Sequence, residues 1–431
     1  MVFVKYGLRC YRKIKSIPVV LARRRYVGEH QILQMSDIVK ILICSSHPKP
    51  SPSAAWTRLG FFGRDWSERG HRVGMLGSFT FKSLDLCGYR MEGQIEIFNI
   101  IPAISIPHPV FFMINYLVAT LVTTFFLLST KPDIVVVSLP GGDTGLGIIH
   151  ACQMTRTKCV VDYRDEWEDF NKSLSKSTLG RAFFNSIHAL STKLYKSCHL
   201  LVATTQRTIS ELEARGITRV KLIPNGVDTA VFKPEPKVEN GVTRILYVGM
   251  IGNYYTIDVV LEAVNKIVSQ GHSNIRFILA GPGDVSDILR KARIIGVDNI
   301  IDFRGILADR NEVAELICQG DIGLVPYDNN PLWRNTLPAK FFEYCACSVP
   351  VVVSALEDSL IAELTNENNL GIVVQPMNAD SLSEAIISLI RSPKELRLYG
   401  SQAHVFAQKF DRTKISRDFL KLLNVIQSIG H

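Results

Sequence analysis

Short runs of β-branched and other apolar residues recur along the whole chain, separated by stretches with helical periodicity. Because the runs are almost continuously apolar, they indicate strands that are buried on both faces. Their repeated alternation with helices predicts parallel sheets with crossover helices. The predicted strands are 38–46, 72–78, 95–100, 133–140, 158–165, 199–205, 220–224, 244–252, 275–283, 300–307, 321–327, 350–355 and 370–376.

The length of 431 residues is too great for one hydrophobic core and indicates two domains. The predicted fold is α/β, with two doubly wound, Rossmann-like domains that face a cleft at the carboxyl ends of their strands. A segment rich in Pro, Gly and charge separates the two halves and is interpreted as a linker. The predicted divisions are a basic extension at 1–35, an N-terminal domain at 36–225, the linker at 226–243, a C-terminal domain at 244–405 and a C-terminal helix at 406–431.

The net charge of +9 is concentrated at the start of the chain. Residues 1–34 contain eight basic side chains against Glu29 alone, whereas the rest of the chain is nearly neutral. No nucleic-acid-binding motif is present, so nucleic acid is not expected as a partner. The basic segment has three interpretations: an arm attracted to anionic lipid, a targeting segment, or the product of an early start codon before Met35. We favour the arm or the early start, because a signal peptide would need a longer apolar run.

Two further features concern the compartment. The odd count of nine cysteines, with only Cys345 and Cys347 closely spaced, predicts free thiols in a reducing cytosol. Residues 109–129 are uncharged over a length near that of a membrane span. Because Asn115 and several threonines dilute this stretch, and because it lies between two strands of one sheet, we expect a helix that is mostly core, with one face at a membrane surface as an option.

The most specific pattern lies between Asn335 and Ala355. A helix is predicted to begin near Pro338 with Thr336 as its cap, and a buried strand follows directly. Free N–H groups and the helix dipole make such a start an anion site. Glu343, about one and a half turns further in, can accept hydrogen bonds from a diol such as a ribose. This combination predicts a nucleotide pocket, and an ordinary amphipathic helix before a buried strand is the alternative.

Glycines follow two strands of the second half. Gly249 and Gly252 lie between a strand and a helix, where backbone N–H groups can approach a diphosphate. Gly281 ends the next strand, where a tight turn without a ligand is an equal alternative. The turn Asn225–Asp228 is interpreted as a structural hinge, because Asn-Gly tolerates a positive φ.

Polar residues also end two strands of the first half. Arg164 and Asp165 follow a buried strand, as ligand contacts or as a buried ion pair. Ser46 and His47 end the first strand, where His47 is either a polar contact or a solvated loop residue.

Five stretches in order resemble the retaining GT-B-fold glycosyltransferases of the "group 1" family, family 4 type, in a subgroup that builds surface polysaccharides. They are RLGFFGRDWSERGHRVGML (58–76), KPDIVVVS (131–138), VVDYRDEWEDF (160–170), VKLIPNGVDTAVFKP (220–234) and LPAKFFEYCACSVPVV (337–352). The resemblance covers about residues 38–410. It implies an acceptor-side N-terminal domain and a C-terminal domain that binds the nucleotide sugar.

The resemblance also implies roles for particular residues. The implied donor-binding residues are Gly249, Gly252, Gly281, Arg304, Arg334, Asn335, Leu337, Pro338, Lys340 and Glu343. The implied catalytic residues are Arg164, Asp165, Glu343 and Lys340, and the acceptor-side residues are Ser46 and His47.

Two departures from the family pattern stand out. Family members usually have Arg directly after the first glycine and Lys shortly afterwards, whereas this chain has Met250 and no nearby Lys. Leaving-group stabilisation therefore passes to other cations, and the candidates are Lys340, Arg334, Arg304 and Arg164. Asn335 replaces the first of the two acidic residues that many members carry eight positions apart.

The resulting hypothesis is transfer of a sugar, with retention, from a nucleotide sugar to a glycan or lipid-linked acceptor. No metal and no cofactor are expected, because no suitably placed Asp-x-Asp motif or His cluster is present. The expected location is the cytoplasm, with peripheral contact at the inner face of the plasma membrane. Two alternatives remain: a catalytically degenerate GT-B subunit that binds a partner, and a nucleotide-sugar 2-epimerase.

Overall fold

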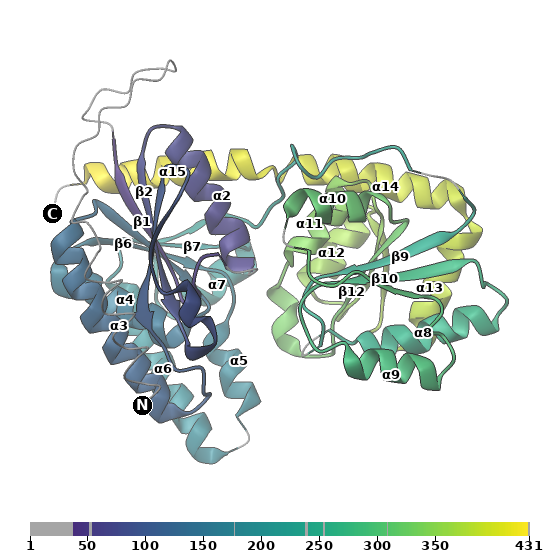
Figure 1. The fold of residues 1–431 in the computed structure, drawn as a ribbon, viewed down its shortest axis with the longest axis horizontal. Helices are drawn as coiled ribbons and strands as arrows, with labels where there is room; N and C mark the ends of the chain where they lie inside the picture. Colours follow the sequence, from purple (N-terminus) through teal and green to yellow (C-terminus); the bar gives the residue numbers. More distant parts are fainter. Residues whose placement is uncertain are drawn as a thin grey trace. The chain divides into compact units, whose positions relative to one another are not determined.

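The computed structural model describes residues 38–50, 54–175, 177–237, 240–252, 255–307 and 309–429, so the predicted basic extension lies outside the described residues. The chain forms two compact units, each with its own sheet and core (Figure 1). Unit 1 contains the chain up to Pro224 and again from Ser416 onward. Unit 2 contains Asn225–Ile415.

Unit 1 is built on an eight-stranded sheet, counting strands within the described ranges. Its strands are β1 (Lys40–Ser45), β2 (Arg72–Phe79), β3 (Gly88–Glu92), β4 (Ile95–Pro102), β5 (Ile134–Leu139), β6 (Lys158–Tyr163), β7 (Leu200–Ala203) and β8 (Val220–Leu222). Their order is β3-β4-β2-β1-β5-β6-β7-β8, and all neighbours are parallel except β3 and β4. The central strands are buried on both faces, as their apolar sequences predict.

Helices cover both faces of this sheet (Figure 1). They are α2 (Ala54–Glu68), the 3₁₀ helix η2 (Phe81–Leu86), α3 (Pro109–Thr130), α4 (Gly142–Thr155), α5 (Trp167–Leu174), α6 (Thr178–Lys196), α7 (Gln206–Ala214) and α15 (Arg412–Ser428). Side chains of α3, α4 and α6 share one core cluster with the strands. The end of the chain packs on α2, where the rings of Trp66 and Phe419 are 5.5 Å apart. This contact completes unit 1 with residues from the far end of the sequence.

Unit 2 has a six-stranded, all-parallel sheet among its described residues. Its strands are β9 (Thr243–Val248), β10 (Ile275–Ala280), β11 (Ile301–Phe303), β12 (Ile322–Pro326), β13 (Val351–Ser354) and β14 (Gly371–Val374). The order β11-β10-β9-β12-β13-β14 places the topological switch point between β9 and β12. The helices are α8 (Ile257–Ser269), α9 (Ser286–Ile294), α10 (Arg310–Cys318), the 3₁₀ helix η3 (Pro331–Asn335), α11 (Ala339–Ala346), α12 (Leu360–Glu367), α13 (Ala379–Arg391) and α14 (Pro393–Gln408).

The predicted fold class is confirmed, and every predicted strand is present. The sequence analysis missed β3, which pairs antiparallel with β4 at the edge of the sheet. Its sequence GYRME carries charge and lies partly exposed, so it lacks the apolar run of a buried strand. A tight turn at Gly93, with φ +59°, joins the two strands.

The predicted C-terminal helix at 406–431 is wrong in its extent. The structure has two helices, α14 and α15, with a break at 409–411. The predicted linker segment causes the break: Val227 donates its N–H to Phe410 O, and Arg412 donates its N–H to Val227 O. A Cβ on Gly226 would lie 2.3 Å from Phe410 O, so glycine allows this approach.

The segment predicted as a linker is also more structured than expected. Val227 and Phe232 are fully buried in the core of unit 2. The division between the units falls at 224/225, whereas the predicted domain ended at residue 225.

Seven cysteines of the described chain are free and buried, in agreement with the prediction. Cys87 is an exception, because it is disulfide-bonded.

Candidate functional site

The switch point of unit 2 contains a close backbone crossing that requires glycine. Gly249 follows β9 and Gly281 follows β10, and their φ angles are +142° and +140°. A Cβ on Gly281 would lie 1.9 Å from the carbonyl oxygen of Gly249. Any other residue at Gly281 would therefore clash with backbone and strain φ. Gly252, with φ +92°, has open space where a Cβ would lie.

Lys340, on the first turn of α11, reaches this crossing from the side. Its ammonium group would lie 2.7 Å from a Cβ built on Gly249. The ammonium lies over the rings of Tyr247 and Tyr255, at 3.8 Å and 3.7 Å from their centroids. It has no hydrogen-bond partner among the described residues, although Lys340 is only 7% exposed. Burial lowers the pKa of Lys340 well below its usual value, and the nearby Glu343 opposes this shift only in part.

Glu343 lies one turn further along α11 and is also buried. Its Oε1 accepts a hydrogen bond of 2.5 Å from Arg310, the first residue of α10. The guanidinium of Arg310 also lies over the ring of Phe232, 4.7 Å from its centroid. The sequence analysis missed Arg310, because nothing in the local sequence pairs position 310 with position 343.

The start of α11 differs from the prediction. Thr336 is not the cap: its hydroxyl donates to Leu332 O at 3.4 Å, and it ends η3. The N-cap is Pro338, which has no side-chain capping bond. The helix starts at Ala339, so Lys340 and Glu343 lie on its first two turns.

Aromatic rings line the same switch point beside Lys340. Tyr255 stacks on Tyr327 with centroids 5.3 Å apart, and Tyr327 stacks on Trp333 at the same distance. Tyr327 follows β12, the neighbour of β9. The stack thus extends from Tyr255, which lies under the Lys340 ammonium, and low-polarity surroundings of this kind strengthen a charge interaction.

The other predicted donor-binding residues lie in varied surroundings. Arg304 forms a two-bond ion pair with Asp302, with N–O distances of 2.8 Å and 2.7 Å, and this pairing raises its pKa. Arg334 pairs with Asp358 at 2.7 Å. Asn335 ends η3 and is half-buried. Leu337 is buried in the core, and its carbonyl accepts a hydrogen bond from Asn225 at 3.1 Å. Of the three predicted donor-binding cations, Lys340 alone lacks a carboxylate within ion-pair distance among the described residues.

The predicted residues of unit 1 gather where neighbouring strands β1, β5 and β6 end. Ser46 follows β1, and its hydroxyl donates to Pro140 O at 3.4 Å. Arg164 follows β6, and its Nε donates to Leu139 O at 2.9 Å and to Ser138 Oγ at 3.0 Å. Desolvation and the nearby Arg164 lower the pKa of His47. Burial raises the pKa of Asp165, and Arg164 opposes the shift.

A buried charge pair lies near this cluster. Arg58, on α2, contacts Asp162 at 3.2 Å and donates to Ile223 O and Pro224 O. Burial lowers the pKa of Arg58, and Asp162 opposes the shift. These bonds join α2 and the segment after β8 to β6, the strand that Arg164 and Asp165 follow.

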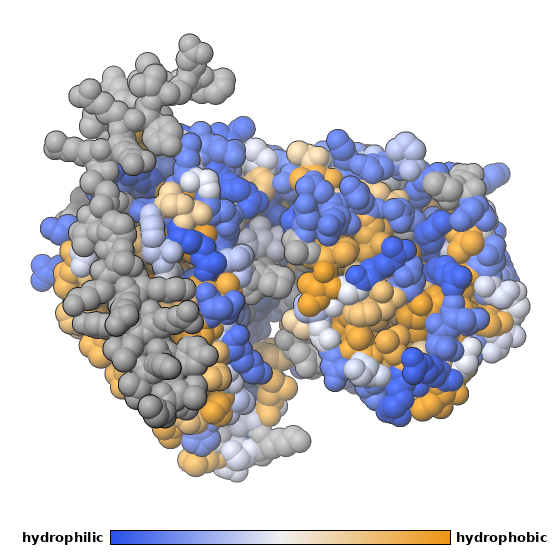
Figure 2. All heavy atoms as spheres, viewed as in Figure 1, coloured by the Kyte–Doolittle hydropathy of each residue, from blue (hydrophilic) through white to orange (hydrophobic). Residues whose placement is uncertain are grey.

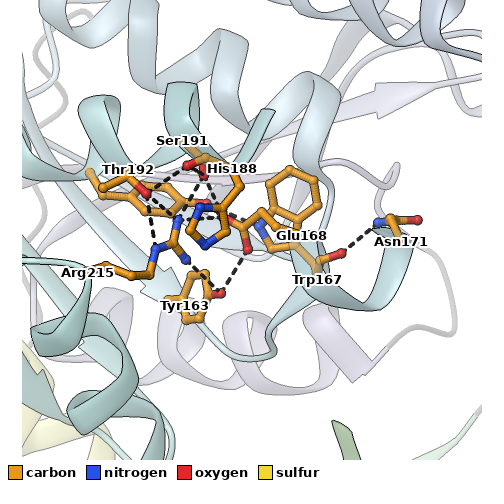
Figure 3. A network of polar contacts seen from close by, with 9 residues as sticks. Tyr163, Trp167, Glu168, Asn171, His188, Ser191, Thr192 and Arg215 are labelled. Atoms are coloured by element: carbon orange, nitrogen blue, oxygen red, sulfur yellow. Dashed lines mark hydrogen bonds and ion pairs between the residues drawn. The ribbon is translucent and has the colours of Figure 1, made fainter. Parts of the chain in front are cut away.

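Figure 3 shows a polar network centred on Glu168, in the first turn of α5. Its buried carboxylate accepts hydrogen bonds from Tyr163 at 2.8 Å, Ser191 at 2.7 Å and Tyr195 at 3.1 Å, and contacts Arg215 at 3.3 Å. The fully satisfied network ties β6, α5, α6 and α7 together, so we interpret it as structural. Within the described ranges, no group of three or more His, Cys, Asp or Glu side chains is arranged to hold a metal ion.

Two parallel-sheet units, each with polar or glycine-rich strand ends at its switch point, define the GT-B class of fold. A family model described as "Glycosyl transferases group 1" matches residues 242–392, and one described as "Glycosyltransferase Family 4" matches residues 59–231. The chain belongs to the group 1 glycosyltransferases with the GT-B fold.

Individual relatives agree with this assignment. A GDP-mannose-dependent alpha-(1-6)-phosphatidylinositol dimannoside mannosyltransferase from Mycobacterium tuberculosis is 27% identical over 200 residues, which are 44% of this chain and 48% of the relative. The chain thus spans about half the length of this curated relative.

Solved structures show the same fold at low sequence identity. A sucrose-phosphate synthase from Thermosynechococcus elongatus aligns with a TM-score of 0.70 and 15% identity, over 90% of this chain and 98% of that one. HepE from Anabaena, in complex with UDP and glucose, aligns with a TM-score of 0.65 and 16% identity, over 90% of this chain and 100% of that one.

Proposed function

We propose that this protein is a retaining glycosyltransferase that moves a sugar from a nucleotide-sugar donor to a hydroxyl of a glycan or lipid-linked acceptor. One observation carries the proposal: the Lys340 ammonium is buried without a hydrogen-bond partner beside the Gly249 backbone. An unpaired buried cation is unfavourable on its own, and an anion bound over Gly249 would pair with it. The diphosphate of a nucleotide sugar is such an anion.

Lys340 takes over the role that the family pattern gives to basic residues after the first glycine. Met250 occupies that position here and is 44% exposed. The cation comes instead from α11, and Gly249 leaves the approach to it free of a side chain. When the diphosphate binds, its charge raises the pKa of Lys340, and the ammonium then stabilises the charge that develops on the leaving group.

Glu343 binds hydroxyl groups of the donor, and Arg310 positions it. The contact with Arg310 engages Oε1 and fixes the direction of the carboxylate. Because an ionised carboxylate only accepts hydrogen bonds, Glu343 suits a ribose or sugar diol. Asn335 supplies a neutral polar group in place of the first family acid.

The acceptor side is assigned to unit 1. Arg164 and Asp165 contact the donor phosphate and a sugar hydroxyl, and Ser46 and His47 contact the acceptor. The lipid named for the mycobacterial relative supports a lipid-linked acceptor, and with it a peripheral location at the cytoplasmic face of the plasma membrane.

The proposed reaction breaks the bond between the anomeric carbon and the diphosphate oxygen, and forms a bond from that carbon to the acceptor oxygen. The acceptor proton passes to the leaving diphosphate, so no protein nucleophile and no metal are needed. Positioning and electrostatic stabilisation of the leaving group lower the barrier. Analysis of the product's anomeric configuration by NMR tests retention, and an inverted product would remove that part of the proposal.

Calorimetric titration with UDP and with GDP tests the donor site. We expect the wild type to bind one of them, and Lys340→Met and Glu343→Ala each to weaken binding by about tenfold, or ~1.4 kcal/mol. Lys394→Met, which removes an exposed lysine of α14, is the matched control and should bind as the wild type does. Equal binding by Lys340→Met and the wild type would refute the role of Lys340.

The second candidate function is a catalytically degenerate GT-B subunit. Met250, in place of the usual family Arg, favours it. Absence of both nucleotide binding and turnover in the wild type would support this candidate over the transferase. The 2-epimerase alternative is not retained, because the relatives described above are transferases or a synthase.

A further inference from the structure

Helix α3 exposes a row of large apolar side chains, and its buried face contains polar side chains beside apolar ones such as Tyr116 and Leu127. Asn115, Thr120 and Thr123 are buried against the rest of unit 1. The large apolar side chains on the outer face are exposed by 38% to 70%. These outer-face residues are Val110, Met113, Ile114, Leu117, Leu121, Phe125 and Leu128. Apart from the adjacent Met113 and Ile114, they are spaced three or four residues apart, which gives one continuous stripe along the helix.

The inner face is held by specific contacts and cannot turn outward without breaking them. Asn115 donates to Asp143 at 2.6 Å and to Ile104 O at 2.9 Å. The helix packs closely along α4: a Cβ on Gly147 would lie 2.5 Å from the carbonyl oxygen of Tyr116. Thr123 is fully buried.

These contacts decide how α3 can meet a membrane. Its 22 residues are long and apolar enough to cross a bilayer. A crossing helix would take the hydroxyl and amide groups of its inner face into lipid and separate Asn115 from Asp143, which is unfavourable. A helix lying in the plane of the interface keeps all inner contacts and buries only the apolar stripe.

The apolar surface extends beyond the helix. Ile104 and Ile106 precede it, and Leu174 and Leu179 are 60% and 81% exposed where α5 meets α6. The start of α3 contacts the start of α6 through Phe112 and Phe183, whose centroids are 5.5 Å apart. Figure 2 shows apolar surface over α3, along the lower left of unit 1.

The charge of the region around α3 indicates which kind of partner covers the apolar stripe. No acidic residue occurs in 97–132 or in 170–210. α6 exposes Arg181, two residues before the Phe183 that contacts α3, and Lys193 and Lys196 on its last turn. Exposed cations on α6, in a region without acidic residues in its sequence, complement anionic lipid head groups. A two-fold contact with a second copy would bring the same cations together and is disfavoured.

We propose that the outer face of α3 lies in the interface of an anionic membrane, parallel to its plane, with the cations of α6 at the head groups. This places unit 1 directly on the lipid surface. The proposal does not depend on the proposed reaction, because its test measures lipid binding without turnover.

Flotation of the full chain with vesicles of phosphatidylcholine, with and without phosphatidylglycerol, tests the proposal. We expect the wild type to bind vesicles containing phosphatidylglycerol, and Leu121→Asp/Leu128→Asp to bind them at least about tenfold more weakly. The matched control is Leu398→Asp/Val405→Asp on α14, since both pairs are seven residues apart and similarly exposed. The control should bind as the wild type does, and circular dichroism should show that both variants fold.

Two further measurements separate the remaining outcomes. Phe125→Trp should be quenched by brominated lipids, and alkaline carbonate should release the bound protein, whereas a spanning helix would stay in the membrane. Reversal of Arg181, Lys193 and Lys196 to Glu should remove the preference for phosphatidylglycerol. The proposal is overturned if the α3 variant binds like the wild type, if only charge reversal within residues 1–37 abolishes binding, or if the α3 stripe proves to hold a second copy in solution.

Discussion

The substitution Lys340→Met should stabilise unit 2 while it disables the proposed donor site. The ammonium of Lys340 is buried and has no hydrogen-bond partner among the described residues. Desolvation of this ammonium is unfavourable by several kcal/mol. The cation–π interactions with the two tyrosine rings, at 3.7 Å and 3.8 Å, offset this cost by about 0.5–2 kcal/mol each. Met has a similar shape and no charge, so we expect a net gain of ~1–3 kcal/mol.

The gain should depend on pH with a definite sign. Burial lowers the folded-state pKa of Lys340, so the unfolded chain binds this proton more tightly. Wild-type stability therefore rises with pH through the folded pKa and levels off near the unfolded value of about 10.4. The advantage of Lys340→Met is full below the folded pKa and vanishes as the pH approaches the unfolded pKa.

Thermal and urea unfolding of the wild type, Lys340→Met and the control Lys394→Met measure this difference. A gain of 1 kcal/mol corresponds to about 2–4 °C in Tm for a unit of this size. A Lys340→Met protein less stable than the wild type would show that the ammonium has a stabilising partner, and the reasoning would be wrong. If Lys340→Met is more stable but binds nucleotide as the wild type does, the buried cation is not part of the nucleotide-binding site.

Three further outcomes can be checked. Gly281→Ala should destabilise unit 2 by about 1–3 kcal/mol or more in urea unfolding, because its Cβ would meet the carbonyl of Gly249 in a strained backbone; an unchanged midpoint would contradict the crossing. Glu168→Gln should cost ~3–5 kcal/mol, because it leaves the mostly buried Arg215 without its carboxylate; a neutral effect in the same assay would contradict the network. Met250→Arg should tighten nucleoside diphosphate binding by about tenfold (~1.4 kcal/mol) in calorimetry, and weaker binding would place the diphosphate away from Gly249.

The sheets could be predicted because their signal is local. Buried parallel strands require continuous apolar runs, and each run that the sequence shows is a strand in the structure. β3 was not predicted, because an edge strand with one exposed side has no such apolar run. The packing of the chain's end on unit 1 was not predicted for another reason. The contact of Phe419 with Trp66 joins residues more than 350 positions apart, and no local sequence pattern encodes that pairing.

The candidate site was predictable in its helix but not in its partners. Lys340 and Glu343 lie on one short helix, so their relative positions could be predicted from the sequence. Arg310 contributes from α10 and meets Glu343 only in three dimensions. The predicted cap Thr336 was wrong because η3 extends through Asn335 and delays the start of α11 to Ala339.

The position of the cation has a consequence for how the proposed donor site would work. An Arg after the first glycine would be on a loop, where water can solvate it. Lys340 is on a buried helix between two aromatic rings, so its charge is poorly solvated until an anion arrives. A site of this kind favours a doubly charged diphosphate over a neutral ligand, since only the anion relieves the desolvation. Under the proposed function, the uncharged Met250 and the burial of Lys340 are therefore two parts of one arrangement, in which stability is given up for anion affinity.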